Sequence, residues 1–170
     1  IHNEEVVRDL EEKGVRVLDT EEDLKNLPEG QGTVVIRSHG VSRYIYDILN
    51  SRKVNVVDAT CPFVKKIHKI VDEHSGAGEA VVIIGSPIHP EVEGIRGWGN
   101  GDTVVIENEA DAKEYNLPEG KKLCIVSQTT FNYNKFQELV EKILKKGYDS
   151  SVLNTICNAT QERQVEAARI

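Results

Sequence analysis

Short runs of β-branched residues alternate with amphipathic stretches along most of the chain. Six runs predict strands and a weaker seventh follows them: 15–18, 33–36, 54–57, 81–84, 103–106, 123–126 and 151–153. The runs are continuously apolar rather than alternating, which is typical of strands buried on both faces of a parallel sheet.

Apolar residues at helical spacing predict helices between these strands. We expect helices over 3–13, 42–51, 63–74 and 132–146, and a last helix that begins near Asn158. Alternating strands and helices favour an α/β fold with parallel sheets. The strand spacing restarts near Thr60 and Cys61, so we expect a first, incomplete α/β unit over 1–60, a second over 61–153 and the start of a truncated third over 154–170.

Composition narrows the possible partners. The 170 residues include 21 Lys and Arg against 28 Asp and Glu, which gives a formal net charge of −7. This balance argues against broad binding to nucleic acid or to an anionic membrane, because both need a basic surface. The acidic balance does not exclude a small anionic ligand that binds in a locally positive pocket. The chain contains no methionine, so we expect it to be part of a longer protein.

Unusual polar residues follow the carboxyl ends of five predicted strands. They occupy residues 37–40, 58–62, 85–91, 127–130 and 154–158. Ligands of open parallel sheets bind at that end of the strands, where helix amino termini also present N–H groups to anions. The five segments therefore predict a single ligand site.

The three cysteines differ in their setting. Cys61 precedes Pro62, a residue suited to the first turn of a helix, and a helix amino terminus favours the thiolate form of cysteine. Cys157 has a similar strand-to-helix setting, whereas Cys124 lies inside an apolar run and is interpreted as a buried apolar residue. Cys61 and Cys157 either share a metal group or are structural. The C-x-x-C spacing of a zinc finger is absent.

Histidines and one glutamate add candidate chemistry. His39 and His89 lie in turns after strands, and His2 precedes the first predicted helix. Histidine donates hydrogen bonds without requiring a full charge, so three of them would suit a phosphate or diphosphate. Glu91 is either an acid of the site or a charge favoured at a helix amino terminus. His68 is interpreted as part of a packed or solvated helix face.

Six segments, taken together, resemble one family in order and spacing. They are Ile1-His2-Asn3, Ser38-His39-Gly40, Asp58-Ala59-Thr60-Cys61-Pro62, His89-Pro90-Glu91-Val92-Glu93-Gly94, Ser127-Gln128-Thr129-Thr130, and Thr155-Ile156-Cys157 with Ala159-Thr160-Gln161 and Arg163-Gln164. The family is that of 4-hydroxy-3-methylbut-2-enyl diphosphate reductase, also called IspH or LytB.

The resemblance implies three small α/β units around a central cavity that holds a 4Fe–4S cluster. It also implies reductive removal of the allylic hydroxyl, which yields isopentenyl and dimethylallyl diphosphates in the bacterial cytoplasm, with electrons from a ferredoxin- or flavodoxin-type donor. By this resemblance Cys61 and Cys157 are cluster ligands, and Glu91 is the proton donor, linked to the substrate through Thr129. The residues implied to bind the substrate are His2, His39, His89, Gln128 and Thr129.

The sequence departs from the family pattern at both ends. A third cluster cysteine, which the family carries upstream of the Ile1-His2-Asn3 segment, is not in the chain, and we expect these 170 residues alone to be inactive. Two other functions stay open: a non-catalytic diphosphate- or nucleotide-binding α/β module, and a redox scaffold with a reactive Cys61. The chain has no G-x-x-x-x-G-K-[ST] or G-x-G-x-x-G motif, which weakens the binding-module hypothesis.

Overall fold

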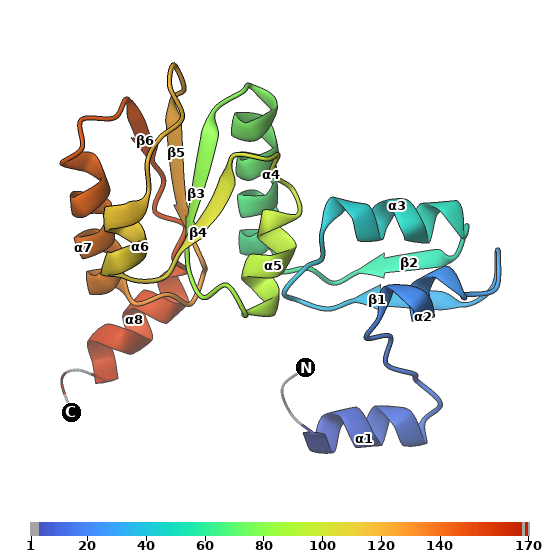
Figure 1. Cartoon of the computed structure of the whole chain (residues 1–170). Coiled ribbons are helices and arrows are strands. Elements are labelled where there is room, and N and C mark those ends of the chain that lie inside the picture. Colours follow the sequence, from blue (N-terminus) through green and yellow to red (C-terminus); the bar gives the residue numbers. More distant parts are fainter. Residues whose placement is uncertain (1–3, 168, 170) are drawn as a thin grey trace.

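The computed structural model describes residues 4–167 and 169, and two separate parallel sheets organise them (Figure 1). The smaller sheet pairs β1 (Thr33–Ile36) with β2 (Asn55–Asp58). The larger has the order β4-β3-β5-β6, built from β3 (Ala80–Ile84), β4 (Thr103–Ile106), β5 (Leu123–Ser127) and β6 (Ser150–Val152). The expected α/β fold with parallel sheets is confirmed, whereas the division into units at 60/61 and 153/154 stays a prediction.

Helices occupy the segments between the strands. They are α1 (Glu4–Glu12), α2 (Glu21–Lys25), α3 (Arg43–Ser51), α4 (Pro62–Gly76), α5 (Pro90–Arg96), α6 (Glu109–Glu114), α7 (Tyr133–Leu144) and α8 (Asn158–Ala167). In the described part of the chain, no helix combines the length and the apolar character needed to cross a membrane.

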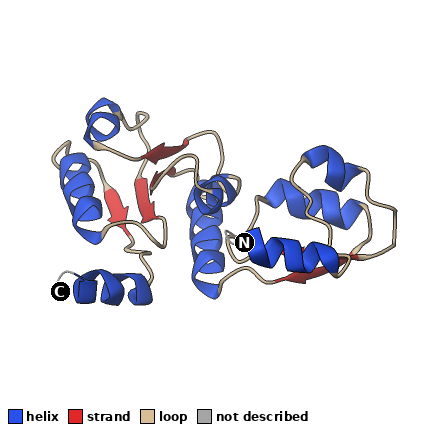
Figure 2. Cartoon of the chain, turned by 90° about the horizontal axis from the view of Figure 1, so that it is seen from below, coloured by secondary structure: helices blue, strands red, loops and turns tan. Residues whose placement is uncertain are grey.

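The two central strands of the larger sheet, β3 and β5, are buried on both faces, as their continuous apolar runs predict. Val82 and Ile125 belong to a core cluster on one face, completed by α6 and by Phe136 and other residues of α7. Val81 and Ile83 belong to a second cluster that includes residues of α4 and α5. Because α4 and α5 lie between the two sheets (Figure 1, Figure 2), they determine where the smaller sheet sits.

The smaller sheet is covered on one face. Ile36 packs in a cluster with Leu24 of α2 and Leu49 of α3. The paired residues Val35 and Val57 point to the other face and remain 64% and 47% exposed.

The structure corrects two features of the sequence prediction. The predicted strand at 15–18 is wrong: these residues have no regular secondary structure, no described strand pairs with them, and Val15 and Val17 are 50% and 46% exposed. Three short helices, α2, α5 and α6, were not predicted. Their starts are fixed by local capping, as at Asn108, whose side chain accepts from the amides of Ala110 and Asp111.

Candidate active site

The predicted site segments follow the carboxyl ends of β1, β2, β3, β5 and β6. All the strands within each sheet are parallel, so these ends share one edge of their sheet. His2 lies outside the residues that the structure describes. The other predicted site residues can be followed through hydrogen bonds and ring contacts.

Glu91 and Thr129 form the most buried polar pair among these residues. Glu91 is 2% exposed and Thr129 is 6% exposed. The backbone amide of Thr129 donates to Glu91 Oε1 at 2.6 Å, and the Thr129 hydroxyl donates to Oε2 at 2.7 Å. Both carboxyl oxygens are therefore held by one residue, which joins the start of α5 to the end of β5.

His89 is oriented by the same turn. It is the N-cap of α5, and its Nδ1 accepts a hydrogen bond from the backbone amide of Glu91 at 3.2 Å. A ring nitrogen that accepts carries no proton, so the proton of the neutral ring is assigned to Nε2. The ring of His39 meets the ring of His89 edge-on, with centroids 5.5 Å apart. The two predicted phosphate-binding histidines, one from each sheet, therefore lie together.

Gln128 supports the loop between β3 and α5. Its Oε1 accepts from the amide of Ser86 at 3.1 Å, and its Nε2 donates to the hydroxyl of Thr130 at 2.9 Å. A Cβ at Gly85 would lie 2.9 Å from the Gln128 Cβ, so this close approach requires glycine. Both ends of the Gln128 amide are thus engaged with the chain, and its contact with a substrate stays a prediction.

Two cysteines are attached to this group of residues through their backbone amides. Cys61 is the N-cap of α4 with Pro62 in the first helical position, as the sequence predicts, and its amide donates to the Ser38 carbonyl at 2.9 Å. The amide of Cys157 donates to the Thr129 carbonyl, also at 2.9 Å. Both cysteines are half-buried, whereas Cys124 is fully buried in β5. Burial raises the pKa of the Cys124 thiol to about 12.

These contacts link the predicted residues into one continuous path. It runs from Cys61 to the Ser38–His39 turn, from His39 to His89, along the chain to Glu91, and through Thr129 to Cys157. The sequence alone did not show which of these residues are in contact. The path joins residues that are almost 100 positions apart.

Sequence reasoning gave no role to two further supports of the path. Thr155 bridges β5 to the Cys157 loop: its hydroxyl accepts from the Ser127 amide at 2.8 Å and donates to the Ser127 carbonyl at 2.6 Å. Asp58 holds the turn before Cys61, because its side chain accepts from the Thr60 amide. The Asp-x-Thr spacing is a turn signal that could have indicated this role.

Asp58 also has a lowered pKa, so its carboxyl group stays ionised over a wide pH range. Burial by itself would raise its pKa, but hydrogen bonds from Lys65, Thr60 and Tyr46 outweigh that effect and lower the pKa to about 2. The charged Asp58 thus keeps the segment before Cys61 in place across the neutral range.

His68 belongs to the packing between the sheets. It is 4% exposed, and burial lowers its pKa to about 4. Its ring stacks on Trp98 with centroids 5.1 Å apart. The interpretation of His68 as a packed helix residue fits this setting.

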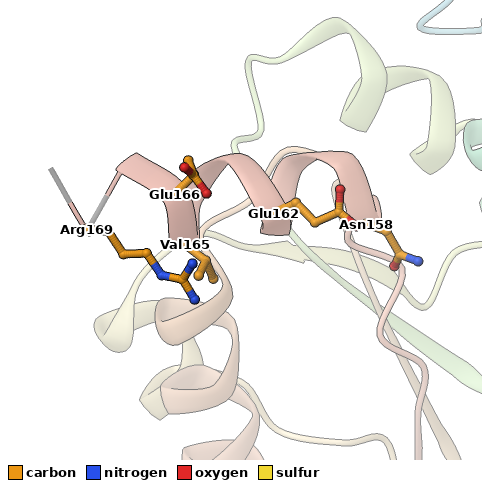
Figure 3. A pocket seen from close by; sticks show the side chains of 5 residues that line it. All are labelled: Asn158, Glu162, Val165, Glu166 and Arg169. Atoms are coloured by element: carbon orange, nitrogen blue, oxygen red, sulfur yellow. The ribbon is translucent and has the colours of Figure 1, made fainter.

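The described residues do not form a complete metal site by themselves. No set of three or more His, Cys, Asp or Glu side chains among residues 4–167 and 169 could hold a metal ion. An open pocket of about 510 Å³ lies elsewhere, along α8 (Figure 3), where it is lined by Asn158, Glu162, Val165, Glu166 and Arg169. Because one helix and the residue beyond it supply the whole lining, this pocket is a surface hollow that contains none of the predicted site residues.

Known proteins resemble this chain over its whole length. The sequence model of the family described as LytB protein matches residues 1–170. The 4-hydroxy-3-methylbut-2-enyl diphosphate reductase of Caldanaerobacter subterraneus is 45% identical over 168 residues, a match that covers 99% of this chain and 57% of that protein. The reductase of the same name from Clostridioides difficile is 36% identical over 170 residues, covering 100% and 60%.

Solved structures agree with the sequence matches. The structure of the E-1-hydroxy-2-methyl-but-2-enyl-4-diphosphate reductase from Plasmodium falciparum superposes with a TM-score of 0.90 at 32% identity, covering 100% of this chain and 53% of that one. A structure of (E)-4-hydroxy-3-methyl-but-2-enyl diphosphate reductase gives 0.78 at 38% identity, covering 96% and 57%. The chain thus spans little more than half the length of these relatives. With the family model matched from the first residue to the last, the chain belongs to the LytB protein family.

Proposed function

We propose that this chain contributes the substrate and proton-donor side of a 4-hydroxy-3-methylbut-2-enyl diphosphate reductase site. The observation that carries the proposal is the continuous path from Cys61 through His39, His89, Glu91 and Thr129 to Cys157. The path brings together two imidazoles and a buried carboxyl group, and the two cysteines are joined to it through their backbone amides. The proposal includes the division into α/β units over 1–60, 61–153 and 154–170.

His39 and His89 are proposed to bind the diphosphate, together with His2. Support comes from the adjacent rings of His39 and His89 and from the Nε2 proton assigned to His89. A ring N–H donates to a phosphate oxygen without adding a full charge to the site. Binding at this end of the sheets would hold the substrate next to the Glu91–Thr129 pair.

Glu91 is proposed to supply the proton that the departing hydroxyl needs. The reaction breaks the allylic C–O bond, releases the oxygen as water, and consumes two electrons and two protons. The Thr129 hydroxyl, which donates to Glu91 at 2.7 Å, can pass a proton from the carboxyl group to the substrate by accepting one and donating another. Fixed positions for both groups lower the cost of bringing acid and substrate together.

Cys61 and Cys157 are proposed as two protein ligands of a 4Fe–4S cluster. Thiolates hold such clusters, both cysteines are half-buried rather than sealed in the core, and the backbone amide of each joins it to the path that contains His89 and Glu91. The remaining cysteine, Cys124, sits inside β5 and does not fit a ligand role. When bound, the cluster supplies the electrons, delivered by a ferredoxin- or flavodoxin-type donor, and a Lewis-acidic iron.

A chimaera tests the proposal, because the chain spans just over half of its relatives. The matched 168 residues of the Caldanaerobacter subterraneus reductase are replaced by this chain, and the protein is purified anaerobically. We expect bound iron and sulfide, and conversion of 4-hydroxy-3-methylbut-2-enyl diphosphate to isopentenyl and dimethylallyl diphosphates in the presence of a reductant.

Variants of the chimaera assign the roles. C61S and C157S should lose bound iron equally, with C124S as the matched control that keeps it. E91Q should keep the iron and lose about 10²- to 10⁴-fold in kcat, the usual contribution of a general acid. A colourless chimaera that still binds diphosphate would support the binding-module alternative instead. An E91Q chimaera with wild-type kcat would remove Glu91 from the mechanism.

A further inference from the structure

One of the contacts between the two sheets lies outside the six family-like segments. Gly97 and Trp98 directly follow α5, on the side of the larger sheet, and contact Val41 and Ser42, which directly precede α3 of the smaller sheet. We call this packing the 97–98 contact. The proposed function assigns it no role.

Gly97 allows the backbones to approach closely. A Cβ built on Gly97 would overlap the Cβ of Ser42 and lie 3.0 Å from its Cα. The backbone of Gly97 has a φ of −70°, which any residue adopts, so only the closeness of Ser42 requires glycine here. The obstructing atoms belong to the base of a side chain and to the backbone, and cannot rotate away.

Trp98 fixes the same approach with directional contacts. Its Nε1 donates to the Val41 carbonyl at 2.9 Å, across 57 residues of chain. The Trp98 ring stacks on the ring of His68 in α4. The Arg43 guanidinium lies 5.2 Å from the centroid of the Trp98 ring. Arg43 also pairs with Asp72 of α4. The hydrogen bond and the ring contacts thus join α3, α4 and the end of α5.

The 97–98 contact lies one short helix away from His89. α5 begins after its N-cap His89 and ends before Gly97, so the two ends of this seven-residue helix carry the histidine and the contact. On the other side, Val41 comes two residues after His39. Within α5, a Cβ at Gly94 would lie 3.5 Å from the backbone of Gly40, an ordinary van der Waals distance. A displacement at Gly97 therefore moves the His39 turn and the His89 turn relative to each other.

We propose that Gly97 and Trp98 are positioning residues that set the spacing of the His39 and His89 rings, and thereby the fit of one diphosphate between the two sheets. The diphosphate part rests on the proposed function, whereas the ring spacing, 5.5 Å between centroids, stands on the structure alone. Neither residue is expected to touch the substrate.

A matched set of glycine substitutions tests the spacing in the chain itself. G97A inserts a methyl group against Ser42, whereas G101A adds one where no atom lies within 4 Å. The nuclear Overhauser effect between the ring protons of His39 and His89 reports the spacing directly. We expect it in the wild type and in G101A, its loss in G97A, and its partial return in G97A/S42G, which removes the obstructing Cβ.

W98F provides a milder perturbation that keeps an aromatic ring and removes the indole N–H. Inorganic pyrophosphate is titrated into each variant of the chain, and KM and kcat are measured in the chimaera. We expect W98F to weaken pyrophosphate binding and raise KM about two- to twelvefold, the range carried by one hydrogen bond. G97A should do so more strongly. In both variants kcat should stay within about twofold, because Thr129 holds both Glu91 oxygens and keeps Glu91 in place while the His39 turn is displaced.

The outcomes separate this proposal from the proposed function. If G97A keeps the ring contact and the pyrophosphate affinity of G101A, or if S42G restores neither, the positioning role is refuted. If wild-type chain and chimaera fail to bind pyrophosphate, the proposed function and the ligand part of this inference fail together. The ring-contact series still decides in that case whether the 97–98 contact sets the spacing.

Discussion

The hydrogen bond between Thr129 and Glu91 offers a quantitative test of the site as a structural unit. Substitution T129V keeps the shape of the side chain and removes the hydroxyl that donates to Glu91 Oε2 at 2.7 Å. Both residues are almost fully buried, so no water replaces the lost donor. A buried acceptor left without its donor costs about 1–3 kcal/mol, and we expect the free energy of unfolding to fall by that amount.

The chain contains a matched control for this substitution. Thr103 is 7% exposed, and its hydroxyl has no hydrogen-bond partner among the described residues. T103V therefore removes a buried hydroxyl that makes no hydrogen bond in the folded state to offset its loss of water. We expect the free energy of unfolding to stay the same or rise. The same chemical change should thus lower the free energy of unfolding at Thr129 but not at Thr103.

Urea unfolding followed by far-ultraviolet circular dichroism measures both variants, with linear extrapolation to water. Adding E91Q and the double variant T129V/E91Q completes a double-mutant cycle, whose coupling energy isolates the pair from general packing effects. The reasoning is refuted if T129V and T103V lower stability equally, or if the cycle gives no coupling between Glu91 and Thr129.

Three further predictions concern the groups around the site. Burial lowers the pKa of His68 to about 4, so the unfolded chain binds its proton more readily between pH 6.5 and 4; stability should be full above about pH 6.5 and fall by about 3 kcal/mol toward pH 4, and H68F should flatten this dependence. G40A should cost about 1–3 kcal/mol more than G78A, because both glycines have positive φ but only at Gly40 would a Cβ meet another side chain, 2.5 Å from His68. Titration of the native chain with a thiol-reactive disulfide should modify two cysteines quickly and Cys124 only after unfolding, since Cys124 is fully buried with a raised pKa.

Each of these three has a clear contrary result. An unchanged pH dependence in H68F would mean that other groups govern acid unfolding. Equal losses in G40A and G78A would leave only the backbone conformation to explain both. Fast reaction of three thiols in the native chain would contradict the buried position of β5.

Part of the fold could be predicted because its signal is local. Six of the seven predicted strands match observed strands to within one residue at either end, because short runs rich in Val and Ile favour strands. The expected cover on both faces is found at β3 and β5, whereas β1 and β2 are covered on one face only. Residues 15–18 have the same local composition but no neighbouring described strand to pair with. Strand formation requires a partner as well as a suitable sequence, so this error could not be avoided from composition.

In the candidate site, too, some features could be predicted from local sequence and others depend on tertiary contacts. The residue types and their positions after strand ends indicated a ligand site, and the resemblance to one family supplied the proposed roles. Neither gave the 2.7 Å hydrogen bond between Thr129 and Glu91 or the ring contact of His39 with His89. The sequence left open whether His68 is packed or solvated, because its neighbours Lys65, Lys66 and Lys69 are charged, and the structure shows that it is buried.

The sequence by itself determined the alternation of strands and helices, the N-cap position of Cys61 before Pro62, and the burial of Cys124, since each depends on residues a few positions apart. Only the tertiary structure decided how two sheets approach each other through Gly97, Trp98 and Ser42. That approach depends on atoms more than 50 residues apart in the chain, whose proximity follows from the packing of α4 and α5 between the sheets and not from any local pattern.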